Sequence, residues 1–134
     1  MNLDRWITQT IFFGDEQGRN GNCTEACVAS LYGLPLESIP DFHSEGEGGY
    51  WPKLRRYFSS NGIYLLHLPP NHTPPVMYFG VGPASRGCNH MVIMMEGEVI
   101  WDPHPSREGL LSVQAIYVPV AFDPTRVGLG AGTI

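Results

Sequence analysis

The spacing of apolar residues changes at residue 63, and this change limits the chain to folds in which the helices precede a run of strands. Before this point, two segments carry apolar residues at helical spacing, 23–32 and 51–60. After it, the period is that of strands in five runs, 63–68, 76–81, 90–96, 98–102 and 111–122. This order predicts an α+β domain whose strands form one separate antiparallel sheet.

The segment 23–32 carries the clearest helix signals in the chain. Asn22 is a candidate N-cap, Glu25 lies in the first turn, and Gly33 follows the last helical residue. Ahead of this helix, residues 5–13 (RWITQTIFF) mix β-branched and aromatic side chains and predict a first strand. Residues 34–40 predict a proline-punctuated turn with one short helical turn.

The second predicted helix, 51–60, has a proline in its first turn and stops at Asn61-Gly62. Its apolar face is expected to hold Leu54, Tyr57 and Phe58, and its exposed side Lys53, Arg55 and Arg56. Between two of the later strands, Glu96-Gly97-Glu98 predicts a tight hairpin turn.

Length and composition favour a single domain. A chain of 134 residues is about one domain, and a hydrophobic fraction of 43% excludes disorder as a class. We expect this domain to span residues 1–124 and residues 125–134 to form a flexible C-terminal tail. Residues 43–49 (HSEGEGG) are expected to form a flexible acidic loop, either a lid or a loop without such a role.

Charge and hydropathy argue against several kinds of partner. Eight Lys and Arg against 13 Asp and Glu give a net charge of −5, too few cations to neutralise nucleic-acid phosphates or to bind an anionic membrane. No run approaches the ~20 apolar residues of a membrane helix, and the N-terminus has no secretory signal pattern. We therefore expect a cytoplasmic protein whose cysteines, Cys23, Cys27 and Cys88, are free thiols.

Cys23 begins the predicted helix 23–32, where unpaired backbone N–H groups and the helix dipole favour an anion. The thiolate is the reactive form of cysteine, so this position suits a nucleophile. A buried structural thiol is the alternative. Cys27 lies one turn later, between Ala26 and Val28, and is predicted to be a small buried core residue.

His90 and Asp102 flank the hairpin that turns at Gly97. His90 opens the apolar strand MVIMM, and Asp102 ends the opposing strand just before a proline. Across a tight hairpin these residues are expected to lie near each other at one end of the sheet, where a carboxylate can orient a catalytic imidazole. The alternative is a solvent-facing pair at the strand ends. Trp101 is expected either to shield this pair from water or to pack within the hairpin.

Gln17 lies six residues before Cys23 in a glycine-bearing loop. A side-chain amide at this place, together with the backbone N–H of the nucleophile, can donate hydrogen bonds to a developing oxyanion. A solvated loop glutamine is the alternative.

These spacings resemble a known family. The pattern Gln17-x5-Cys23 at a helix start, followed by His90 before an apolar strand and then by Trp101-Asp102-Pro103, is similar to the papain-like cysteine peptidases over about residues 10–105. Within them it is most similar to the compact bacteriocin-processing peptidases, which cleave leader peptides after a double glycine. One difference is Asn22, where that subgroup usually has Asp. The segments GNCTEACVASLYGLPLESIPDF and GCNHMVIMM also resemble small proteins of phages and bacteria.

The resemblance implies a papain-like fold in which a nucleophile helix packs on an antiparallel sheet. It implies Cys23 as nucleophile, His90 as general base and acid, Asp102 as the residue that orients His90, and Gln17 as oxyanion donor. The expected activity is cysteine-dependent hydrolysis of a peptide, isopeptide or other amide bond, with a protein or peptide substrate and no cofactor.

Three other functions remain open at this point. With an amine acceptor the same site would be a transamidase or acyltransferase. A papain-like module that binds or inhibits a partner without catalysis would fit the small size of the chain. A zinc site built from Cys23, Cys27, Cys88 and His90 has suitable ligand types, but structural zinc sites more often use a two-residue knuckle than Cys-x3-Cys within a helix.

Overall fold

The computed structural model describes residues 6–12, 21–43, 49–123 and 125. Within them, helix α1 (Cys23–Tyr32), the 3-10 turn η2 (Leu36–Ser38) and helix α2 (Tyr50–Ser59) precede all of the strands. The strands are β1 (Ile63–Leu68), β2 (Tyr78–Pro83), β3 (Asn89–Met95), β4 (Glu98–Trp101) and β5 (Ala115–Ala121). The predicted α+β class is therefore confirmed.

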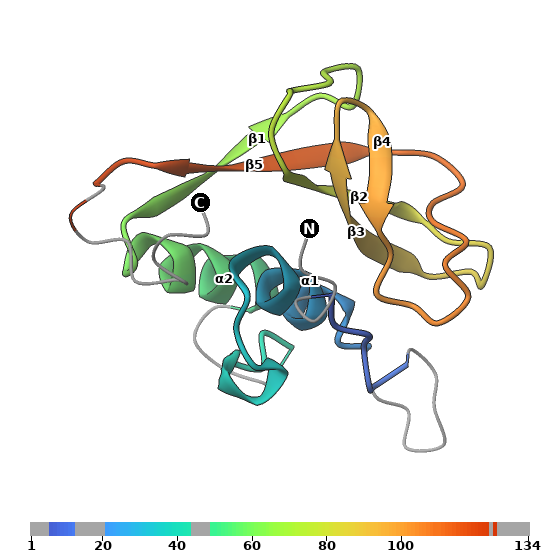
Figure 1. Cartoon of the computed structure of the whole chain (residues 1–134), viewed down its shortest axis with the longest axis horizontal. Helices are drawn as coiled ribbons and strands as arrows, with labels where there is room; N and C mark the ends of the chain where they lie inside the picture. Colours follow the sequence, from blue (N-terminus) through green and yellow to red (C-terminus); the bar gives the residue numbers. More distant parts are fainter. Residues whose placement is uncertain (1–5, 13–20, 44–48, 124, 126–134) are drawn as a thin grey trace.

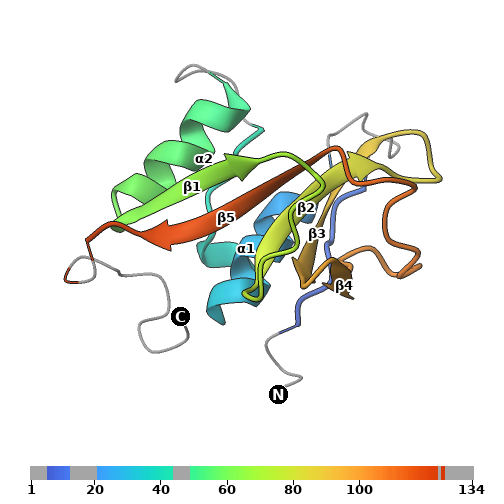
Figure 2. The same cartoon turned by 90° about the horizontal axis from the view of Figure 1, so that it is seen from above.

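The five strands form one antiparallel sheet in the order β1-β5-β2-β3-β4. The last strand in sequence, β5, thus lies between β1 and β2. Both helices lie on one face of this sheet (Figure 1). Seen from above, α2 runs alongside β1 while α1 lies beneath β2 and β3 (Figure 2). This arrangement places the helix that begins with Cys23 against the strand that contains His90.

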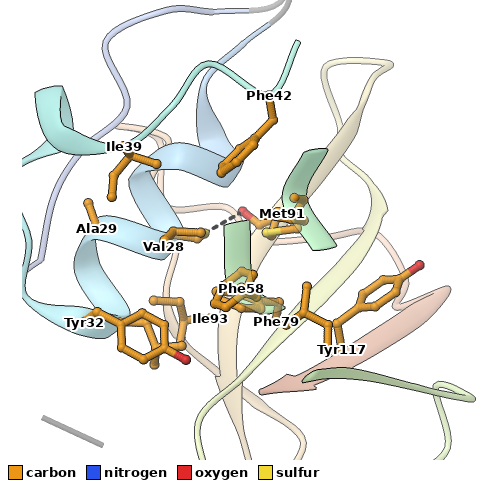
Figure 3. Packing of buried hydrophobic residues seen from close by; sticks show 14 of the residues in the cluster. Val28, Ala29, Tyr32, Ile39, Phe42, Phe58, Phe79, Met91, Ile93 and Tyr117 are labelled. Carbon is orange, nitrogen blue, oxygen red and sulfur yellow. Dashed lines mark hydrogen bonds between the residues drawn. The ribbon is translucent and has the colours of Figure 1, made fainter. Parts of the chain in front are cut away.

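The core lies between α1, α2 and the sheet. Every residue of α1 after Cys23 is buried, and its small residues, such as Ala29, allow close approach. Val28 and Tyr32 of α1 face Phe58 of α2 and Phe79 of β2 (Figure 3). Burying each large side chain of this kind contributes about 1.5–3 kcal/mol. Helix α1 is therefore held on several sides.

Cys27 is fully buried in this core, as predicted. Its thiol donates a hydrogen bond to the backbone carbonyl of Met91 over 3.4 Å, drawn as the dashed line in Figure 3. Met91 follows His90 in β3, and Cys27 lies one turn after Cys23 in α1. This bond therefore joins the two elements that carry the predicted nucleophile and base.

The two ends of α1 differ in how well the sequence predicts them. At the C-terminal end, Gly33 has φ 67° and ψ 37°, and its N–H donates to the carbonyl of Ala29, which confirms the expected cap. At the N-terminal end, Asn22 makes no side-chain cap. Its Oδ1 instead accepts the N–H groups of Thr10 and Ile11, over 3.0 and 2.9 Å. The predicted capping role of this side chain is wrong, because a segment distant in sequence supplies stronger partners.

The predicted strand over 5–13 is wrong for its described part, since residues 6–12 contain no strand. Their backbone groups bond instead to side chains and to backbone groups outside the strands. The Ile7 N–H donates to Ser30 Oγ over 2.8 Å, and the Ile7 carbonyl accepts the indole N–H of Trp101 over 3.0 Å. Trp101 also stacks on Trp6 with ring centroids 5.7 Å apart. Trp101 thus packs against the segment 6–12, and not only within the hairpin as the alternative expects.

Helix α2 begins one residue earlier than predicted and buries Leu54 and Phe58 as expected, with Tyr57 half-buried. The prediction that Lys53 lies on its exposed side is wrong, since this residue is buried. The long aliphatic stem of a lysine can cover apolar surface, which a charge pattern alone does not reveal.

The later strands lie where the period predicts them, and 63–68 matches β1 at both ends. The hairpin turn is confirmed, with φ 54° at Glu96 and 83° at Gly97. Strand β5 is shorter than the predicted 111–122. Of the predicted tail, 125–134, all but Thr125 lies outside the described residues, as does 44–48 of the acidic loop. In the described part of the chain, no helix has the length and apolar character needed to cross a membrane.

Candidate active site

The N-terminus of α1 and the start of β3 meet at a cavity of about 530 Å³. Cys23 and His90 both line it, although many residues separate them in the sequence. Asp102, just after β4, lies behind His90. The structure thus brings together three of the four predicted site residues. The fourth, Gln17, lies outside the described residues.

His90 and Asp102 form a buried pair. The Nε2–H of His90 donates to Asp102 Oδ1 over 2.6 Å, and each residue is only 3% exposed. Two backbone groups also donate to this carboxylate, the His104 N–H to Oδ1 over 2.8 Å and the Gly109 N–H to Oδ2 over 2.7 Å. The alternative of a solvent-facing pair at the strand ends is therefore wrong.

The surroundings of this pair favour its charged form. Burial by itself lowers the pKa of His90, but hydrogen bonds to Asp102 and Cys23 and the charges of both residues raise it, to about 9. Burial acts to raise the pKa of Asp102, yet the bonds from His90, His104 and Gly109 leave it below its ordinary value. At neutral pH, the ring is thus an imidazolium paired with a carboxylate.

Cys23 is the third member of the group. Its side chain lies near enough to the His90 ring to help raise the pKa of that ring, and because Asp102 occupies Nε2, the ring nitrogen left for the thiol is Nδ1. Cys23 is also the first residue of α1, where backbone N–H groups have no acceptor within the helix. An imidazolium and a helix N-terminus both stabilise a thiolate. The sulfur is half-buried and faces the cavity.

Gln9 is a site residue that the sequence did not single out. It lines the cavity and is 5% exposed. Its Nε2 donates to the Ile11 carbonyl over 2.9 Å, whereas its Oε1 has no hydrogen-bond partner within the described part of the chain. The sequence predicts a strand over this segment. In the structure, residues 6–12 instead run along α1 and β4, and this path brings the Gln9 side chain to the cavity.

Aromatic residues at the start of α2 form another wall of the cavity. Tyr50 and Trp51 line it, and Tyr50 lies against the His43 ring with centroids 4.6 Å apart. The Tyr50 hydroxyl also hydrogen-bonds the hydroxyl of Thr24, the residue after Cys23. These contacts hold the start of α2 next to Cys23. No sequence motif signals them, because they depend on how α1 and α2 pack.

Cys88 and His104 also line the cavity. The His104 ring meets the His90 ring edge to face at 6.2 Å. The thiol of Cys27 instead donates a hydrogen bond to the backbone carbonyl of Met91 in the core. The four residues of the alternative zinc site therefore do not converge. Among the residues that the structure describes, no three His, Cys, Asp or Glu side chains are grouped so as to hold a metal ion.

Comparison with protein-family models, with curated proteins and with solved structures finds no match for this chain.

Proposed function

We propose that the protein is a papain-like cysteine hydrolase that cleaves a peptide, isopeptide or other amide bond. The observation that carries this proposal is the buried His90–Asp102 pair, joined at 2.6 Å, with Cys23 beside the ring in the lining of the same cavity. A solvated or purely structural histidine needs no such carboxylate behind it and no thiol in front of it. The α+β arrangement, with the cysteine at the start of a helix packed on an antiparallel sheet, agrees with the resemblance.

In the first half of the reaction, the Cys23 thiolate attacks the substrate carbonyl carbon. The carbonyl oxygen becomes an oxyanion, which accepts the backbone N–H of Cys23 and a glutamine amide, assigned to Gln17 by the resemblance. The imidazolium of His90 then gives its Nδ1 proton to the nitrogen of the leaving amine, and the C–N bond breaks. The products of this half are a free amine and a thioester on Cys23.

In the second half, neutral His90 takes a proton from water, and the resulting hydroxide attacks the thioester carbonyl. The C–S bond breaks, the acid product leaves, and the thiolate–imidazolium pair is restored. Asp102 keeps the imidazole in one orientation and stabilises its charged form throughout. An amine in place of water would give a new amide, which is the transamidase alternative.

The test is the rate at which iodoacetamide alkylates each thiol at neutral pH, followed by mass spectrometry of the separate cysteine-containing peptides. Cys88 is the matched control, because it lines the same cavity without the helix terminus. We expect Cys23 to react at least about tenfold faster than Cys88, and His90→Gln to remove most of that difference. Equal rates at Cys23, at Cys88 and at the thiols of the unfolded chain would refute an activated nucleophile.

The substrate class is tested with a panel of electrophilic probes. The panel holds a leader-like peptide ending in Gly-Gly, a ubiquitin-like protein and a simple amide analogue, each carrying the same C-terminal electrophile. We expect covalent capture by the wild type and none by Cys23→Ala. Capture that persists in Cys23→Ala, or binding to both proteins without capture, would favour a module that only binds its partner.

A further inference from the structure

A second cavity, of about 550 Å³, lies beside the catalytic one. The two cavities share Gly21 and His43 in their walls, so a substrate that crosses this rim can occupy both. Three carboxylate residues line the second cavity, Glu25, Glu37 and Asp41, whereas its described lining contains no Lys or Arg. The cavity therefore has an excess of negative charge.

Glu25 is the buried member of this set. It lies in α1, two residues after Cys23, and positions two apart on a helix do not face each other. Cys23 thus serves the catalytic cavity while Glu25 serves the second one. Glu25 is 5% exposed, and its Oε2 accepts the Phe42 N–H over 3.1 Å.

The other carboxylate oxygen of Glu25, Oε1, is buried and has no hydrogen-bond donor within the described part of the chain. A buried polar atom without a partner is costly and rare, so it calls for a donor from outside. Burial raises the pKa of this carboxyl to about 7, and the charge of Asp41 adds to that effect. The side chain is therefore readily ionised when a cation approaches.

The missing donor must bring positive charge. His43 does not supply it, because partial burial lowers the pKa of its ring more than the Asp41 charge raises it. The described carboxylates are also not grouped as a metal site requires. An ammonium or guanidinium group supplies both the missing donor and the positive charge, since it carries several N–H donors together with its charge.

We propose that this second cavity is a specificity subsite for a cationic group of the substrate, with Glu25 as the residue that receives it. This inference rests on the proposed hydrolase function and adds a substrate class to it: peptides that carry Lys or Arg close to the cleaved bond. The cationic group belongs to a neighbouring residue and not to the scissile bond itself, because the second cavity opens across the rim formed by Gly21 and His43.

The first experiment uses peptide chloromethyl ketones that alkylate Cys23. Lysine is placed one, two or three residues before the electrophile, and a matched set carries Nε-acetyl-lysine at the same places. We expect one lysine probe to react about tenfold faster than its acetylated partner with the wild type. In Glu25→Gln this preference for lysine over acetyl-lysine should fall to about threefold or less.

The matched control is Glu98→Gln, which removes an exposed carboxylate on β4 that does not line this cavity. It should keep the full preference for lysine. Wild-type protein that does not distinguish lysine from acetyl-lysine at any of the three places, or Glu25→Gln that keeps the preference, would overturn the proposal. Iodoacetamide needs no subsite, so its rate at Cys23 shows separately whether the proposed hydrolase chemistry has failed.

A second measurement needs no covalent reaction and distinguishes an amine from a metal ion as the cation that binds. We expect n-butylammonium, but not n-butanol, to raise the Tm of Cys23→Ala, and Glu25→Gln in the same background to abolish the rise. When the wild type turns over a peptide substrate in the presence of n-butylammonium, competitive inhibition indicates that the amine occupies a site for a substrate side chain. Formation of an N-butyl amide product indicates instead that the amine enters an acceptor site. A rise with calcium chloride in place of the amine would show a metal site and refute the proposal.

Discussion

Asp102 and Glu25 are two buried carboxylates near the start of α1, and their surroundings shift their pKa values in opposite directions. They are 3% and 5% exposed. Asp102 receives three donated hydrogen bonds, and its pKa lies below the ordinary value. Glu25 Oε2 accepts the Phe42 N–H, and burial raises the pKa of this carboxyl to about 7. Burial acts to raise the pKa of both carboxyls, and the donors and the charge of His90 around Asp102 outweigh it only there.

This difference fits the roles proposed for the two residues. A group that must stay charged to hold an imidazolium needs its donors built into the fold, as Asp102 has. A group that receives a cationic ligand must keep an acceptor atom unused until that ligand arrives, as Oε1 of Glu25 does.

The largest effect is expected from Asp102→Asn, which keeps the shape of the side chain but removes its charge. Without the bond to the carboxylate and its charge, the pKa of His90 falls below about 9. The thiol then meets an imidazole that is mostly neutral, and kcat/KM falls by roughly 10³-fold at neutral pH.

The pH dependence gives the check on this substitution. In the wild type, kcat/KM should decline at high pH as His90 loses its proton near pH 9. In Asp102→Asn the same decline should begin at lower pH. A profile of kcat/KM against pH measures both positions, and an unmoved alkaline limb would mean that Asp102 does not control the charge of His90.

The second effect concerns stability. Its pH dependence has the opposite sign to that of a carboxylate with a lowered pKa, because Glu25 has a raised pKa in the folded state. Between about pH 4.5 and about pH 7, the unfolded chain loses this proton while the folded protein retains it. The stability contributed at low pH is therefore lost as the pH rises, by up to about 3 kcal/mol.

Glu25→Gln removes this loss while keeping an acceptor for the Phe42 N–H. Relative to the wild type, the variant should gain stability between about pH 5 and about pH 8, measured as the free energy of unfolding in urea at each pH. Glu98→Gln, at an exposed position, should show no such gain. A variant that is less stable than the wild type at the higher pH would show that Glu25 already has a cationic partner in the folded protein.

Local signals predicted the elements that support this comparison. The period of apolar residues located α1 and β1 with their observed bounds, and the hairpin turn at Glu96-Gly97 brought His90 and Asp102 together as expected. Both predictions depend on residues close in sequence, where helix caps and tight turns have clear patterns.

Contacts between distant segments account for what the sequence did not reveal. Glu25 looked like an ordinary first-turn residue, and its burial depends on Phe42, in the loop that follows η2. Gln9 lay in a predicted strand, but the bonds of Ile7 to Ser30 and Trp101 direct that segment along the cavity instead. Such contacts leave no local pattern, because the two partners lie far apart in the sequence.

The smallest effect is expected at Gln9. This residue extends the comparison to a neutral group, because its buried Oε1, like that of Glu25, has no hydrogen-bond partner among the described residues. If this atom accepts a backbone N–H of a bound peptide, Gln9→Ala should raise KM by about tenfold and leave kcat nearly unchanged. Gln17→Ala, at the proposed oxyanion donor, should instead lower kcat by about 10²-fold. Steady-state kinetics with one peptide substrate separate the two outcomes. A drop in kcat for Gln9→Ala with none for Gln17→Ala would exchange their roles, since the second N–H of the Gln9 amide would then be the donor to the oxyanion.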